Sequence, residues 1–162
     1  MSERKSNPSD ADHQDREMVI SRVIAAPRDL VFAAFTDREH ISAWWGPNGF
    51  RTTTYEKDVR VGGVWRFTMH GPDGTDYPNK IVYTEVVKPE RLAYDHSGDE
   101  ARDEHRFSTV ITFDDLGGKT KVTLRALFAT VEACEANKKF GAVEGGEQTL
   151  ARLDRFLATS QS

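Results

Sequence analysis

Short segments with alternating apolar and polar residues fill the middle of the chain and are followed by one amphipathic segment at the C-terminus. A two-residue alternation is typical of strands that have one buried face. Leu150, Leu153 and Leu157 follow helical spacing instead and predict a terminal helix with one buried face. Because strands and helices do not alternate, we expect an antiparallel sheet packed against this helix. The predicted strands cover residues 18–24, 52–56, 64–70, 81–87, 92–94, 107–113 and 122–128.

Two short helices are predicted between the first two strands. Pro27 suits the first position of a helix, and apolar residues in the segment 30–35 repeat at helical spacing. Thr36 and Glu39 match a capping box that would begin a second helix, and Gly46-Pro47 would end it. Glycines interrupt the terminal segment, so its helix is expected to be broken there.

The bulk composition indicates one domain without a nucleic-acid or membrane partner. The chain has 162 residues, 38% of them hydrophobic, which is enough for one core. Lys and Arg number 22 against 26 Asp and Glu, and there is no basic block to contact phosphates. No apolar run approaches the ~20 residues of a membrane span, and no leader sequence is evident, so we expect a soluble, cytoplasmic protein.

The first sixteen residues differ in composition from the rest. Residues 1–16 are almost entirely polar and are expected to form a disordered tail that is dispensable for folding. Residues 17–160 then form the single domain. The sole cysteine, Cys134, cannot form an internal disulfide and is expected to be a small buried residue.

Five short motifs occur in the same order as in a known family. They read APRDLVF, WWGP, GGVWRF, PERL and EQTLARL. Together they resemble the Activator of Hsp90 ATPase homologue 1-like family, a branch of the START/Bet v 1-like helix-grip superfamily, over roughly residues 18–158. The resemblance implies an α+β helix-grip fold: a curved antiparallel sheet of about six to seven strands around a long C-terminal helix, with two short helices after the first strand.

The strand faces also predict where a ligand would lie. Trp65, Phe67 and Met69 alternate along one strand, and aromatic residues with a methionine suit an adaptable apolar pocket. The same pattern fits an ordinary core, so both interpretations stay open. The residues that we expect to line a cavity are Trp44, Trp45, Trp65, Phe67, Met69, Tyr83, Ile111, Phe113, Gly146 and Leu150.

One position departs from the family pattern. Members commonly carry Gly-Trp before Glu-Gln-Thr-Leu, whereas this chain has Gly145-Gly146. The missing indole would widen the cavity or loosen the helix there. The hypothesis is that Gly146→Trp fills the cavity, with overpacking of a site that is already full as the opposing outcome.

The polar segment 95–105 contains His96, His105 and several carboxylates, which raises the question of a metal site. Its ligands lack the close, fixed spacing of a structural zinc site, so a solvated acidic loop is the favoured interpretation. His70, beside a predicted turn, is expected on the surface, with a place at a pocket rim as the alternative. We therefore expect no metal and no cofactor.

Three functions remain compatible with the sequence. The first is a binding module that encloses a small apolar or amphipathic molecule. The second is a cavity enzyme of the cyclase or hydrolase sort, which would need a buried ionisable group among Tyr83, Glu85, Asp95 and Arg125. The third is a protein-interaction or chaperone-assisting domain, as the resemblance suggests. A homodimer is possible, and no phosphate loop or nucleophile elbow points to catalysis.

Overall fold

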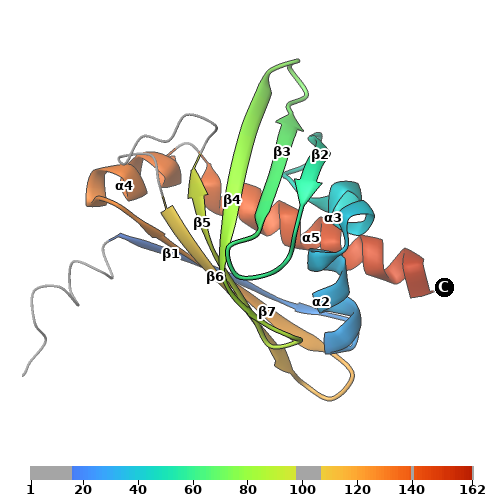
Figure 1. The fold of residues 1–162 in the computed structure, drawn as a ribbon. Coiled ribbons are helices and arrows are strands. Elements are labelled where there is room, and N and C mark those ends of the chain that lie inside the picture. The colour runs from blue at the N-terminus through green and yellow to red at the C-terminus, as the bar shows by residue number, and fades with distance from the viewer. Residues whose placement is uncertain (1–15, 98–106, 140, 162) are drawn as a thin grey trace, which may run out of the picture.

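A seven-stranded antiparallel sheet curves around a long helix in the computed structural model, which describes residues 16–97, 107–139 and 141–161 (Figure 1). The strand order is β1-β7-β6-β5-β4-β3-β2, so β2 to β7 form a meander and β1 pairs with β7. The predicted α+β helix-grip fold is therefore confirmed. The strands are β1 (Glu17–Ile24), β2 (Arg51–Lys57), β3 (Val64–His70), β4 (Asp76–Val87), β5 (Arg91–Ser97), β6 (Phe107–Asp115) and β7 (Thr120–Phe128).

The described residues also form four helices. They are α2 (Arg28–Thr36), α3 (Arg38–Trp44), α4 (Val131–Lys139) and α5 (Ala142–Gln161). Figure 1 shows α2 and α3 beside the C-terminal half of α5, with α4 at its opposite end. The chain continues as a helix through Gly145 and Gly146, where an interruption was expected, and α4 was not predicted as a separate helix. Within the described residues, no helix is long and apolar enough to cross a membrane.

Asp37, not Thr36, caps the N-terminus of the second short helix, α3. The side chain of Asp37 accepts hydrogen bonds from the backbone N–H groups of Glu39 at 2.9 Å and His40 at 3.0 Å. The hydroxyl of Thr36 donates to the carbonyl of Phe32 at 3.0 Å, one turn back in α2. The predicted capping box is therefore wrong by one residue, because Thr36 still belongs to the preceding helix and its hydroxyl is used there.

Residues 1–15 of the predicted tail lie outside the described part of the chain. Arg16 is the first described residue, and it is bound to the end of β7. Its guanidinium donates to the carbonyl of Phe128 at 2.8 Å, and the N–H of Phe128 donates to the Arg16 carbonyl at 2.9 Å.

Two β-bulges bend the sheet around the helices. Register shifts leave Tyr55 of β2 and Thr84 of β4 without a direct partner on the neighbouring strand. A bulge bends its strand and increases the local twist, so both strands curl toward the face that carries α5. This curvature gives the sheet a concave side, on which its apolar side chains converge.

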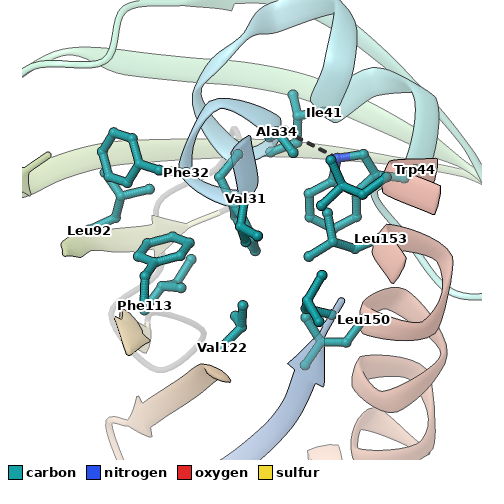
Figure 2. Packing of buried hydrophobic residues seen from close by; sticks show 14 of the residues in the cluster. Val31, Phe32, Ala34, Ile41, Trp44, Leu92, Phe113, Val122, Leu150 and Leu153 are labelled. Carbon is teal, nitrogen blue, oxygen red and sulfur yellow. Dashed lines mark hydrogen bonds between the residues drawn. The ribbon is translucent and has the colours of Figure 1, made fainter. Parts of the chain in front are cut away.

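A closed aromatic core fills one half of that concave side (Figure 2). Phe113 of β6 makes edge-to-face contacts with Phe32 and Phe35 of α2, at ring-centroid distances of 5.3 and 5.2 Å. Trp44 packs on Phe35 at 4.8 Å, and its indole N–H donates to the carbonyl of Ala34 at 3.2 Å. Leucines from the C-terminal half of α5 close this core from the other side: Leu150, Leu153 and Leu157.

Candidate functional site: an internal cavity

The other half of the concave side contains a cavity of about 490 Å³. One wall is the inner face of the sheet, where lining residues come from β1 and from β3 to β7. The opposite wall is the first two turns of α5, and the loop of residues 45–50 closes one side. Its volume falls within the range of about 300–1,000 Å³ that is typical of small-molecule sites. Apolar lining residues from the sheet are Met18, Ile20, Phe67, Met69, Ile81 and Leu124.

The cavity exists because α5 presents two different faces to the sheet. In its C-terminal half, Leu150 and Leu153 fill the space in front of the strands. In its first two turns, the residues that reach the cavity include Ala142, Gly145 and Gly146, which have small side chains or none. Glu144, Gln148 and Thr149 also line the cavity, but they are polar. The helix thus presents no large apolar side chain at this level, and the space in front of the curved sheet stays open.

Four of the ten predicted residues line the cavity. Trp45, Phe67, Met69 and Gly146 are part of its wall. The other six belong to the buried core that adjoins it: Trp44, Trp65, Tyr83, Ile111, Phe113 and Leu150. Alternation along a strand assigns a side chain to the inner face, but it does not say which half of that face the helices cover.

Gly146 lines the cavity and also lies against Ile20 of β1. A Cβ atom built on Gly146 would overlap the Cδ1 atom of Ile20, whereas a Cβ on Gly145 would meet the Pro47 ring at an ordinary 3.4 Å. This Cδ1 atom is the end of a flexible side chain that itself lines the cavity, so an indole at position 146 requires Ile20 to move aside. Filling of the cavity by Gly146→Trp therefore stays a prediction, and overpacking at a cost of about 1–3 kcal/mol is the opposing outcome.

A polar pair on the cavity wall was missed in the sequence. His96 was assigned to a solvated loop, but it lies in β5, which extends to Ser97, and it lines the cavity. Residues 98–105 of that segment lie outside the described residues. Asn79 also lines the cavity, because β4 begins at Asp76, five residues before the predicted strand. Pro78 obscured this part of the strand, since proline disfavours a strand interior.

The hydrogen bonds between Asn79 and His96 define the protonation state of the His96 ring. Asn79 donates through Nδ2 to the carbonyl of Tyr77 at 2.7 Å, so its Oδ1 faces the Nε2 atom of His96 at 2.6 Å as an acceptor. Burial lowers the pKa of His96 to about 4. We therefore assign a neutral ring with the proton on Nε2. Its Nδ1 atom is buried and has no hydrogen-bond partner among the described residues.

A second buried polar pair lies in the core beside the cavity. The Nζ atom of Lys57 donates to the hydroxyl of Tyr83 at 2.7 Å and lies 4.0 Å from the centre of the Trp65 ring. Burial lowers the pKa of Lys57 to about 7, and burial together with Tyr94 raises the pKa of Tyr83 above its usual value. Tyr83 is thus buried and paired, but it lies outside the cavity wall.

The other ionisable candidates for catalysis form pairs at the surface. Glu85 accepts from Arg91 at 2.7 Å, and Asp95 accepts from Ser108 at 2.8 Å. Arg125 bridges to a carboxylate of β1 at 3.1 Å, with half of its side chain exposed. None of these three candidates lines the cavity. No cluster of three or more potential metal ligands occurs within the described residues.

The loop of residues 45–50 is tied to α5 and to the sheet. Arg152 donates to the carbonyls of Gly46 at 2.9 Å and Pro47 at 3.0 Å, and Gln148 accepts from the N–H of Asn48 at 3.1 Å. Gly46 has a φ of +112°, which other residues rarely adopt. The motif WWGP therefore shapes the cavity wall through its backbone as well as through Trp45.

The chain belongs to the family described as "Activator of Hsp90 ATPase homolog 1-like protein", whose model matches residues 25–158. This finding confirms the resemblance of the five motifs. No curated protein matches the chain significantly.

Solved structures show the same fold. A solution structure of a protein from Arthrobacter aurescens is 23% identical, with a TM-score of 0.84, and the match covers 91% of this chain and 89% of that chain. A crystal structure of a protein from Nitrosomonas europaea is also 23% identical, with a TM-score of 0.82 and coverage of 91% and 97%. A Mycobacterium smegmatis protein is 25% identical, with a TM-score of 0.80 and coverage of 90% and 93%.

The contact between Gly146 and Ile20 can be tested with a double-mutant cycle. Gly145→Ala should raise the free energy of unfolding by up to about 1 kcal/mol through helix propensity, whereas Gly146→Ala should gain less or lose stability. Ile20→Val removes the Cδ1 atom, so Gly146→Ala should be more favourable by about 1 kcal/mol in that background. Denaturant unfolding measures all four variants. Equal effects of Gly146→Ala in both backgrounds would contradict the contact.

The buried Lys57 predicts a pH dependence of stability. Between pH 7 and pH 10.5 the unfolded lysine still binds a proton that the folded one has lost, so stability rises with pH in this window. The difference in unfolding free energy between the wild type and Lys57→Met should therefore grow in favour of the wild type from about pH 7 toward pH 10, and stay constant below pH 7. Lys121→Met, on an exposed lysine of β7, is the control. A flat difference for Lys57→Met would contradict its burial.

Proposed function

We propose that this domain binds a small apolar or amphipathic molecule inside the cavity between α5 and the sheet. The observation that carries the proposal is the cavity itself, a space of about 490 Å³ next to a densely packed core. The cavity is partly open to solvent, so its apolar lining atoms lack packing contacts and face water. An apolar occupant restores those contacts and removes its own surface from water.

The composition of the wall favours a molecule with one polar end. Aromatic and aliphatic side chains from the sheet and the loop, such as Phe67, Met69 and Trp45, make up most of the wall. Asn79, His96 and Thr109 add polar groups on β4, β5 and β6. Apolar pockets with a few convergent polar groups are typical of sites that hold and orient small molecules.

The proposal is tested by filling the cavity from the sheet side. Ala126 of β7 is 7% exposed and lines the cavity, so Ala126→Phe places a ring in that space. The control is Ala158→Phe, at an exposed position of α5. Nile red, an uncharged dye with environment-sensitive fluorescence, serves as the probe.

The wild type and Ala158→Phe should bind Nile red saturably, and Ala126→Phe should bind it at least about tenfold more weakly, which corresponds to about 1.4 kcal/mol. Circular dichroism and thermal melts establish that each variant is folded. Absence of saturable binding by the folded wild type, or equal affinity in the two folded variants, would overturn the proposal.

A further inference from the structure

We infer that the cavity selects uncharged amphiphiles with a hydroxyl group and rejects the corresponding carboxylates. The inference rests on the proposed function, because it specifies the chemical class of the molecule bound at that same site. Two independent features of the wall carry it: the charge of its lining residues and the unused hydrogen-bonding capacity of Asn79.

The charge of the wall disfavours anions. Among the described residues that line the cavity, Glu144 is the charged side chain, and neither lysine nor arginine is present. Arg152 is close to the loop, but its guanidinium donates to the carbonyls of Gly46 and Pro47. A carboxylate in this cavity would therefore lose hydration without gaining a cation from the described residues, which is strongly unfavourable.

The N-terminus of α5 does not compensate for the missing cation. Gly141 and Ala142 line the cavity, and a helix N-terminus attracts negative charge. Glu144 already places a carboxylate in this first turn, and a Cβ atom built on Gly141 would lie 3.9 Å from its Oε1 atom. A second anion would meet the repulsion of Glu144, and a helix dipole is a weaker influence than the hydration of a full charge.

Asn79 supplies the recognition of a hydroxyl. A side-chain amide has two N–H donors and two acceptor lone pairs. One donor of Asn79 is bound to the Tyr77 carbonyl and one lone pair accepts from His96, so one of each is left at the cavity wall. A hydroxyl group both donates and accepts a hydrogen bond, so it can bind the free N–H donor and the free lone pair of Asn79 together. His96 acts as a positioning residue, because its Nε2–H group holds the orientation of the amide.

The test uses displacement of Nile red at pH 8 by three matched compounds: n-decanol and its methyl ether, each below its solubility limit, and decanoate below its critical micelle concentration. We expect n-decanol to displace the dye from the wild type at least about tenfold more effectively than decanoate. n-Decanol should also surpass the methyl ether, which accepts but cannot donate. Asn79→Leu should remove the advantage of the alcohol over the ether, and Asn137→Leu, at an exposed position of α4, should preserve it.

Each outcome has one meaning. Displacement by decanoate as effective as by n-decanol would overturn the exclusion of anions while leaving the binding function intact. Equal displacement by the alcohol and the ether in the wild type would overturn the role of Asn79, even if Asn79→Leu failed to fold. Absence of saturable Nile red binding would overturn the proposed function and this inference with it.

Discussion

The packing of α5 against the concave face of the sheet determines both the stability of this domain and its cavity. One half of the helix carries Leu150, Leu153 and Leu157, which meet the aromatic residues of α2 and α3. The other half carries Ala142, Gly145 and Gly146, where the helix backbone approaches the sheet without large side chains. One helix thus closes a core at one end and leaves a space at the other. The bulges in β2 and β4 curve the sheet around that space.

The buried polar groups are consistent with an interior that avoids net charge. His96 is neutral because burial lowers its pKa to about 4, and burial brings the pKa of Lys57 down to about 7. Both side chains keep a strong hydrogen bond, to Asn79 and to Tyr83 respectively. Satisfied hydrogen bonds make such burial tolerable, whereas an unpaired charge would not be tolerated. The interior is therefore suited to uncharged molecules.

The sequence predicted the architecture better than the site. Alternation along the strands and leucine spacing in the last helix predicted the helix-grip fold, because both patterns are local and each aims side chains at one face. The same patterns assigned Trp65 and Phe113 to the cavity, although they belong to the closed core. The positions of α2 and α3 decide which half of the concave face is covered. These positions depend on contacts between distant segments, which the periodicity of one segment does not predict.

Local signals also misplaced the polar residues of the site. His96 is followed by a strongly polar segment, so it was interpreted as part of that loop, yet its strand extends through Ser97. Asn79 directly follows Pro78 and precedes the predicted start of the strand at residue 81, because proline disfavours a strand interior. Gly146 lines the cavity, but its closeness to Ile20 joins positions that are far apart in the chain, which no local signal contains.

The central claim is that the first two turns of α5 and the sheet enclose a space that an apolar molecule can occupy. A crystal structure of the protein with a bromine-labelled long-chain alcohol tests it directly, because anomalous scattering locates the bromine without reference to the side chains. The account predicts a bromine peak inside the cavity and the hydroxyl within hydrogen-bonding distance of Asn79. A structure in which Trp45 and Met69 collapse into this space, with bromine bound elsewhere on the surface or absent, would contradict it.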